Sequence, residues 1–235
     1  MTNIICVIQA RMGSSRVPGK AMLDLAGKPL LWHMIDRVRR VEGVTDVVLA
    51  TTQDPRNQPM IELAAQEGLK YHCQPGEDDI AGRIAGAIKN CPGDIVLKVG
   101  GDCPLIDPEV LQKIVNTAVA AGDADFVSNR LDWSYPLGLS ADVLSRKAIE
   151  WCDENFTDAE DRELFAVRIR DNPDRFKVIG VVNDVDLSRH GWTVDEPKDV
   201  GFMRDIFDHL YRKGEVFGMA ETLAYLTASG KLDHG

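Results

Sequence analysis

Positive charge is scarce in this 235-residue chain, which has 27 lysines and arginines against 37 aspartates and glutamates, a formal net charge of −10. Non-specific binding to nucleic acids or membrane surfaces needs a positive field, so the composition argues against both kinds of partner. Long apolar runs are also missing, since no stretch approaches the ~20 residues of a membrane span. Any anionic ligand must therefore be met by a local cluster of lysine and arginine.

Cysteine lacks the pairing that a disulfide framework or a structural zinc site requires. The odd number of cysteines includes no pair at CxxC spacing: Cys6, Cys73, Cys91, Cys103 and Cys152. This pattern indicates a reducing compartment. The first residues enter an apolar run without a basic leader, so we expect no signal peptide and a cytoplasmic protein.

Short apolar runs alternate with amphipathic segments along the first 128 residues. The pattern predicts strands at residues 4–10, 46–51, 70–73, 94–99 and 125–128, and helices at 29–40, 58–67, 79–89 and 108–121. This alternating order predicts an α/β fold, with a mostly parallel sheet covered by helices on both faces.

The second half of the chain is less regular. We expect strands at residues 138–144, 176–183 and 192–194, and helices at 145–154, 160–171, 197–212 and 219–228. No repeat, low-complexity tract or linker interrupts the sequence. We therefore expect residues 1–235 to form a single domain, in which a nucleotide-binding half (1–128) is continued by residues 129–235.

The most informative stretch is the loop at residues 9–20, which reads QARMGSSRVPGK and follows the first strand. Ligands of open α/β sheets bind at the carboxyl ends of strands. Glycines and serines allow close backbone approach, and Arg11, Arg16 and Lys20 supply exposed positive charge, which together suit a polyphosphate. The glycine spacing matches neither a Walker A loop nor GxGxxG, and a solvated basic loop is the alternative.

Two carboxylates follow other predicted strands. Asp102 lies in GGDCPLIDP after residues 94–99, and Asp195 lies in WTVDEP after residues 192–194. Carboxylates at strand ends suit a hard cation such as Mg²⁺ bound to phosphate oxygens. Either could instead cap a helix, although Asp107 before Pro108 is the better cap.

Several other residues carry weaker signals. The DxD strings at residues 123–125 and 184–186 match a permissive glycosyltransferase pattern, and the first precedes its strand and so points to the wrong end of the sheet. Cys103 and His33 are interpreted as packing residues, and His190 as a residue near the Asp195 strand that could reach the site.

These stretches together resemble the cytidylyltransferase family, in particular its SpsF-like, spore-coat polysaccharide biosynthesis branch. The resemblance extends over nearly the whole chain and is carried by the loop at 9–20, GDCPLIDP at 101–108 and WTVDEP at 192–197. The chain is also similar to the cytidylyltransferases for Kdo and sialic acid, which share the basic loop and two metal-binding aspartates.

The resemblance implies a Rossmann-like, GT-A-type nucleotide-diphospho-sugar transferase fold, CTP as donor, Mg²⁺ as cofactor and a CMP-activated sugar or sugar acid for polysaccharide biosynthesis. It implies catalytic roles for Arg11, Lys20, Asp102 and Asp195, with the two aspartates holding the metal. The residues that it implies for nucleotide binding are Gln9, Ala10, Arg11, Met12, Gly13, Ser14, Ser15, Arg16, Lys20, Arg83, Lys98, Gly101 and Asp102.

On the acceptor side, the resemblance implies roles for Tyr135, Leu137, Ser140, Arg162 and Glu163. The sequence departs from the branch here, because Leu137 and Ser140 replace two aspartates of Tyr-Pro-Asp-Gly-x-Asp, and Leu164 replaces the histidine of Asp-Arg-Glu-His. Since the nucleotide-side residues are intact, we expect retained nucleotide chemistry and an unusual acceptor.

Two other functions remain open from the sequence. A glycosyltransferase that consumes a nucleotide sugar would share the fold, and a nucleotide-binding regulatory module would need no turnover. The sequence leaves open the acceptor, the choice of CTP over UTP, and the oligomeric state, a homodimer included.

Overall fold

The computed structural model describes residues 3–232, and within that range a seven-stranded sheet forms the centre of the molecule. Its strands are β1 (Ile4–Gln9), β4 (Val44–Thr52), β5 (Lys70–Gln74), β6 (Ile95–Gly100), β7 (Phe126–Ser128), β8 (Ala141–Ser145) and β9 (Val178–Gly180). Their order across the sheet is β5-β4-β1-β6-β8-β7-β9. Only β8 runs antiparallel to its neighbours among these strands, so the predicted mixed, mostly parallel sheet is confirmed.

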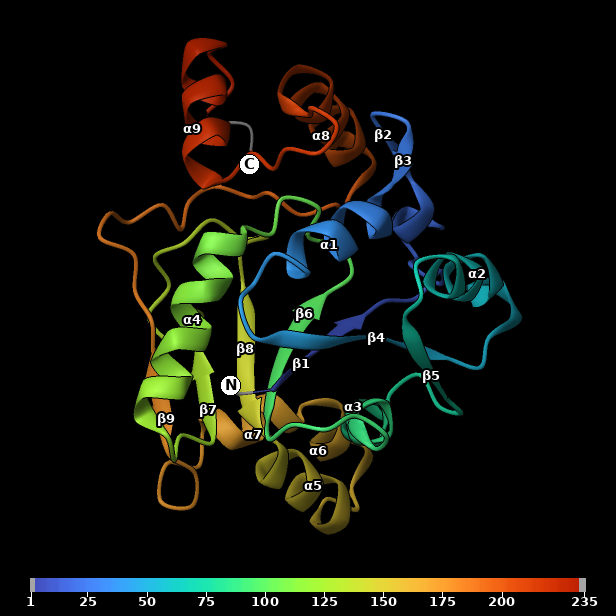
Figure 1. Ribbon diagram of the computed structural model, residues 1–235, viewed down its shortest axis with the longest axis vertical. Coiled ribbons are helices and arrows are strands. Elements are labelled where there is room, and N and C mark those ends of the chain that lie inside the picture. Colours follow the sequence, from blue (N-terminus) through green and yellow to red (C-terminus); the bar gives the residue numbers. More distant parts are fainter. Residues whose placement is uncertain (1–2, 233–235) are drawn as a thin grey trace.

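Helices cover both faces of this sheet (Figure 1). One face packs against α1 (Leu30–Val38), α2 (Gln58–Gln66), α4 (Pro108–Ala121), α8 (Pro197–Leu210) and α9 (Met219–Ala228). The other packs against α3 (Ile80–Ile88), α5 (Arg146–Asn155) and α7 (Phe165–Arg170). Successive residues of β1 belong to the two cores in turn, with Ile4 in the first and Ile5 in the second, because side chains alternate along a strand. This explains why β1 is a continuous apolar run.

The predicted elements of the first 128 residues are all present, and their ends differ from the prediction by no more than two residues. The chain also forms short features that the sequence did not predict. These are a hairpin of β2 (Asp24–Leu25) and β3 (Lys28–Pro29) and two 3₁₀ turns at Lys20–Met22 and Pro55–Asn57.

The second half corrects three predictions. The predicted strand at 192–194 is wrong, because its backbone bonds to loops, with Trp192 N–H donating to Leu137 O and Val194 N–H to Asp102 O. The strand predicted at 176–183 shrinks to β9. The single helix predicted at 160–171 is two helices, α6 (Ala159–Glu163) and α7, separated by Leu164. The alternation of apolar residues at 192–194 reflects the burial of Trp192 and Val194 beside loops. None of the strands within residues 3–232 pairs with this segment.

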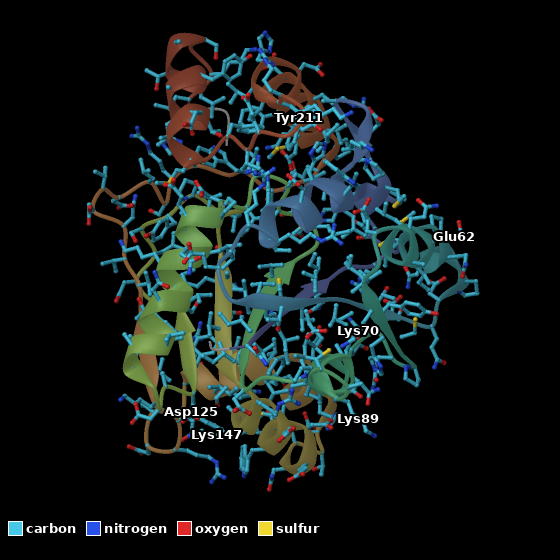
Figure 2. The ribbon with its side chains drawn as sticks, in the orientation of Figure 1. Glu62, Lys70, Lys89, Asp125, Lys147 and Tyr211 are labelled. Atoms are coloured by element: carbon cyan, nitrogen blue, oxygen red, sulfur yellow. The ribbon has the colours of Figure 1, made fainter. Side chains whose placement is uncertain are left out.

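The carboxyl ends of β1 and β6 lie side by side at the centre of the sheet, where Gln9 pairs with Gly100. The first predicted DxD string lies at the other end, because β7 begins directly after Asp125 (Figure 2). None of the helices within residues 3–232 is long and apolar enough to cross a membrane.

Candidate active site

The loop after β1 folds back on itself beyond the carboxyl end of that strand. Its backbone is held by Asn57, whose side-chain oxygen accepts the Met12 N–H at 2.8 Å, and by the bond from Gly19 N–H to Met12 O at 3.0 Å. Gly19 adopts φ 74°, a left-handed conformation that glycine tolerates without strain. The chain then enters the 3₁₀ turn that begins at Lys20.

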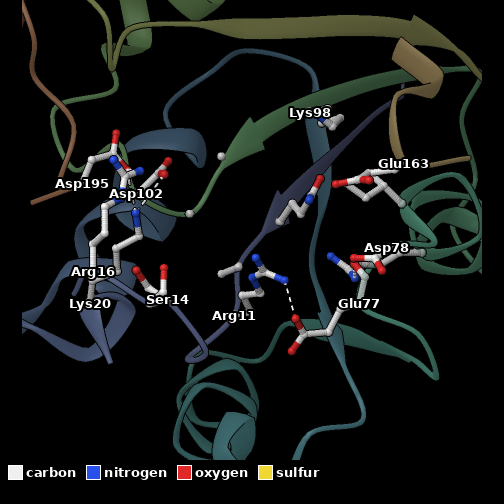
Figure 3. A pocket seen from close by; sticks show the side chains of 17 residues that line it. Arg11, Ser14, Arg16, Lys20, Glu77, Asp78, Lys98, Asp102, Glu163 and Asp195 are labelled. Carbon is white, nitrogen blue, oxygen red and sulfur yellow. Dashed lines mark hydrogen bonds and ion pairs between the residues drawn. The ribbon is translucent and has the colours of Figure 1, made fainter. Parts of the chain in front are cut away.

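Lys20 lies inside the site, which corrects the prediction of an exposed loop cation. Its side chain is only 13% exposed. The ammonium donates to Asp102 Oδ2 at 3.0 Å, to Asp195 Oδ1 at 3.0 Å and to Val194 O at 2.7 Å (Figure 3). Two carboxylates 93 residues apart in the chain (195 − 102) therefore converge on one cation.

Each of the two aspartates is positioned by its own strand or loop. Asp102 follows β6 through Gly101, whose N–H donates to Gln9 O at 2.8 Å. A Cβ at Gly101 would lie 2.5 Å from Ala10 Cβ, so this close approach requires glycine. Asp195 is brought to Asp102 by the bond from Val194 N–H to Asp102 O at 3.0 Å.

The environment of Asp195 favours its ionised form. Burial raises its pKa, but the hydrogen bonds from Lys20 and Thr193 outweigh burial, so the pKa lies below the usual range. Thr193 Oγ1 donates to Asp195 Oδ2 at 2.9 Å, and Arg16 lies 3.7 Å from Oδ1. Asp195 is therefore available as an anion near neutral pH.

A cavity of about 400 Å³ opens beside this cluster and extends toward Lys98 and Glu163. Most of the sequence-predicted site residues line it. They are Gln9, Ala10, Arg11, Ser14, Ser15, Arg16, Lys20, Arg83, Lys98, Gly101, Asp102, Glu163 and Asp195. Met12 and Gly13 belong to the loop but are not among the lining residues.

Two lining carboxylates were missed by the sequence reading, Glu77 and Asp78. Glu77 pairs with Arg11 at 2.6 Å across the cavity (Figure 3). Both follow β5, so the strand-end argument that selected Asp102 could have found them. In this structure Arg11 is therefore paired with a carboxylate.

Arg83 lies beneath the segment that carries Glu77. Its guanidinium donates to the carbonyl oxygens of Gly76 and Glu77, while its Nε is buried without a hydrogen-bond partner among the described residues. Burial lowers the pKa of Arg83, and repulsion from Arg11 lowers it further. An unpaired buried N–H is costly, so this donor is a candidate for a ligand contact.

The predicted acceptor residues do not form one group. Tyr135 is 3% exposed and its hydroxyl donates to Val182 O at 3.4 Å, so it belongs to the core. Arg162 donates to Asp79, Asp153 and two backbone carbonyls, which brace α6 against α3 and α5. A direct acceptor contact by either side chain is not supported.

The remaining predicted acceptor residues are also separated. Glu163 lines the main cavity, whereas Leu137 lines a second cavity of about 610 Å³ that shares Arg16 and Asp195 with the first. Ser140 is partly buried and lines neither of these two cavities.

The weaker candidates prove to be structural. His33 is buried against Phe207 and Tyr211, and burial lowers its pKa to about 4. His190 is also buried, 3% exposed, and lines neither cavity. Burial, with the Asp102 charge beside it, raises the pKa of the Cys103 thiol, which therefore makes a poor nucleophile.

Comparison with known proteins identifies the family. The cytidylyltransferase family model matches residues 5–135, which include the basic loop and Asp102. The chain belongs to the cytidylyltransferase family. A cytidylyltransferase from Leptospira borgpetersenii serovar Hardjo-bovis superposes with a TM-score of 0.90 at 24% identity, covering 99% of this chain and 97% of that one. The predicted Rossmann-like nucleotidyltransferase fold is thereby confirmed.

Two relatives in sequence extend the comparison of this cytidylyltransferase. An uncharacterized protein of Methanocaldococcus jannaschii is 30% identical over 208 residues, which cover 88% of this chain and 84% of that protein. The 3-deoxy-manno-octulosonate cytidylyltransferase of Anaeromyxobacter dehalogenans is 37% identical over 123 residues. That match spans about half of each chain, 52% here and 49% there.

Proposed function

We propose that this cytidylyltransferase transfers the cytidylyl group of CTP to an oxygen of a small sugar-like acceptor, most simply a sugar acid. The acceptor oxygen bonds to the α-phosphorus, the bond from that phosphorus to the bridging oxygen breaks, and pyrophosphate leaves. The proton of the acceptor hydroxyl passes to solvent. No covalent intermediate with the protein is needed, since positioning and charge neutralisation supply the catalysis.

The observation that carries this proposal is the convergence of Asp102 and Asp195 on Lys20 beside the loop after β1. The loop adds Arg11 and Arg16 to Lys20, and together these cations can neutralise the charge that develops on pyrophosphate. Arg11 must exchange Glu77 for a phosphate oxygen to do so. Because the loop carries three cations, a triphosphate donor suits it better than the diphosphate of a nucleotide sugar.

The donor set at Asp102 and Asp195 fits Mg²⁺. Both carboxylates lie 3.0 Å from one positive centre, the Lys20 ammonium. Within residues 3–232, no group of three or more His, Cys, Asp or Glu side chains is arranged to hold a metal ion alone. Mg²⁺ is often held by one or two carboxylates together with substrate phosphates. When bound, the ion would polarise the α-phosphoryl group, while Lys20 turns to the phosphates.

The acceptor assignment rests on relatives. The Anaeromyxobacter relative is named for a sugar acid, 3-deoxy-manno-octulosonate, and matches this chain over 123 residues. We extend the sugar-acid class to this chain and place the reaction in polysaccharide biosynthesis in the cytoplasm. The departures at Leu137, Ser140 and Leu164 indicate that the acceptor differs from that sugar.

A screen for pyrophosphate release tests the proposal. Each of the four nucleoside triphosphates is offered with Mg²⁺ and a panel of sugar acids and sugar phosphates. We expect release with CTP and at least one acceptor. Release of a nucleoside diphosphate from a nucleotide sugar would instead identify a glycosyltransferase, and CTP binding without turnover of any acceptor would indicate a regulatory module.

A further inference from the structure

Lys98 is a partly buried cation that donates no hydrogen bond to another residue within 3–232. It lies in β6, its side chain is 16% exposed, and it lines the main cavity. Among the described residues its ammonium has one ionic partner, Asp142 Oδ2, at 3.6 Å, which is too long for a hydrogen bond. An ammonium has three donors, and the Lys98 ammonium lines a cavity in which an oxygen of a bound molecule could accept from it.

A polar row across three strands holds this ammonium in place. Lys98 of β6 pairs in register with Asp142 of β8, which pairs in register with Ser128 of β7. Ser128 Oγ donates to Asp142 Oδ1 at 2.7 Å and accepts the N–H of Arg130 at 3.1 Å. The Asp142 side chain is 5% exposed, so its charge is buried in a sheet whose neighbouring rows are apolar. Asp142 keeps the lysine side chain directed along the sheet without satisfying its donors.

Lys98 is separated from the triphosphate loop. Figure 3 shows it at the opposite side of the cavity from Asp102, Asp195 and Lys20, and near Glu163. Two residues of strand, roughly 7 Å, separate Lys98 from Gly100 at the end of β6. A small sugar derivative that reacts beside Asp102 could span that distance. Glu163 is exposed, so solvent screens its charge more than it screens that of Lys98.

We propose that Lys98 determines acceptor specificity by binding an anionic group of the acceptor, a carboxylate or a phosphate monoester, and that Asp142 is the residue that positions it. This inference rests on the proposed function. It reassigns Lys98, which the family resemblance places with the nucleotide, to the acceptor. Glu163 then lies where it can accept a hydrogen bond from a hydroxyl group of the same molecule.

The test compares unmodified protein with Lys98→Met, Lys98→Arg and Asp142→Asn, and uses Lys89→Met in an exposed part of the chain as a matched control. The acceptors are pairs that differ in one anionic group: 3-deoxy-manno-octulosonate and its C1 amide, and a hexose 1-phosphate and the free hexose. Binding of each is measured by calorimetry in the presence of a non-hydrolysable CTP analogue and Mg²⁺, and KM is measured wherever turnover occurs. The two pairs distinguish a carboxylate from a phosphate.

We expect the unmodified protein to prefer the anionic member of at least one pair. Lys98→Met should weaken binding of that member, or raise its KM, by about 10- to 100-fold, the worth of a charge-assisted hydrogen bond. Lys98→Arg should retain much of the acceptor binding that Lys98→Met loses. Asp142→Asn should lower the preference for the anionic member less than Lys98→Met does. The dissociation constant for CTP alone should change by less than about two-fold, as with Lys89→Met.

The inference is overturned if no anionic compound is preferred, or if Lys98→Met weakens CTP binding as much as acceptor binding. Uniform loss of both with a lowered melting temperature would indicate a structural ion pair and would also overturn it. Failure of the proposed function looks different, because the unmodified protein would then bind no CTP, or would bind CTP and release no pyrophosphate with any acceptor.

Discussion

The two ends of the central sheet both carry aspartates and lysines, but they differ in what satisfies the carboxylates. At the carboxyl ends of β1 and β6, Asp102 and Asp195 share the ammonium of Lys20, and a cavity opens beside them. At the other end Asp125 is 8% exposed, accepts from Ser145 Oγ and the Lys177 N–H, and faces Lys147 at 3.1 Å (Figure 2).

This difference separates the candidate site from a carboxylate that is held by partners within the protein. Backbone and hydroxyl donors fix Asp125 in place. Asp102 and Asp195 instead share one lysine, whose ammonium another cation could replace. A DxD pattern in the sequence therefore carries little information until the end of the strand on which it lies is known.

The largest expected effect is on activity at the ligand end. Lys20→Met should lower kcat/KM for pyrophosphate release by ~10²–10³, the usual cost of one charge-stabilising donor in a transition state. Lys147→Met, at the other end, should change it by less than about two-fold, since that side chain is 69% exposed and far from the cavity. Near-normal turnover by Lys20→Met would remove the loop from the mechanism.

The second effect concerns the metal. Activity should vanish in excess chelator and return with Mg²⁺, because carboxylate and phosphate oxygens select hard cations. Asp102→Asn and Asp195→Asn should each raise the Mg²⁺ concentration for half-maximal activity by about 10-fold or more, a typical cost of disturbing a metal's ligand environment. Asp125→Asn is the control and should leave the Mg²⁺ requirement unchanged. Full activity in chelator would exclude the two-aspartate site.

The third expected effect is on the pH dependence of folding stability, and it involves a residue at neither end of the sheet. Burial lowers the pKa of His33 to about 4, below its ordinary 6.5. The unfolded chain therefore takes up a proton before the folded one. The protonation of His33 therefore leaves the free energy of unfolding unchanged above pH 6.5. It lowers this free energy by ~3 kcal/mol between pH 6.5 and 4.

Urea unfolding at pH 7, 6 and 5 measures this dependence. His33→Gln should flatten the curve over that interval, whereas His209→Gln, on the exposed side of α8, should follow the unmodified protein. Parallel curves for His33→Gln and the unmodified protein would show that His33 titrates normally.

The smallest expected effect is on folding stability, and it compares the carboxylates at the two ends of the sheet. Asp125→Asn should lower the free energy of unfolding by ~1–3 kcal/mol, because it weakens several buried hydrogen bonds at once. Asp102→Asn should lower it by less, since Asp195 still pairs with Lys20. Denaturant titration of both variants checks this order, and the reverse order would contradict the distinction between the two ends.

The regular elements of the first half were predictable because each carries its own signal. Residues 4–10 form a buried apolar run, Pro108 follows the capping Asp107, and Gly68 ends the segment after α2. The second half was harder to predict. The segment at 192–194 has the alternation of a strand but lies beside loops, and Leu164 divides a helix that periodicity extends without a break.

The candidate site shows the same division. The loop at 9–20 and the position of Asp102 after β6 are properties of the chain that motif and element order reveal, whereas Asp195 was selected by its motif and by a strand that does not form. The sequence does not reveal that Lys20 lies between the two aspartates, because that contact joins segments more than 80 residues apart. Nor does it reveal that Arg162 braces helices while Glu163, the next residue, lines the cavity.

The sequence by itself determined the order of strands and helices in the first half, the basic loop and the family, since each rests on residues close together in the chain. The tertiary structure alone decided which charges meet. It inserted β8 between β6 and β7, and that insertion places Asp142 beside Lys98 and Ser128 beside Asp142. Contacts between distant segments depend on register and strand order, and a single sequence specifies these only through the packing of the whole molecule.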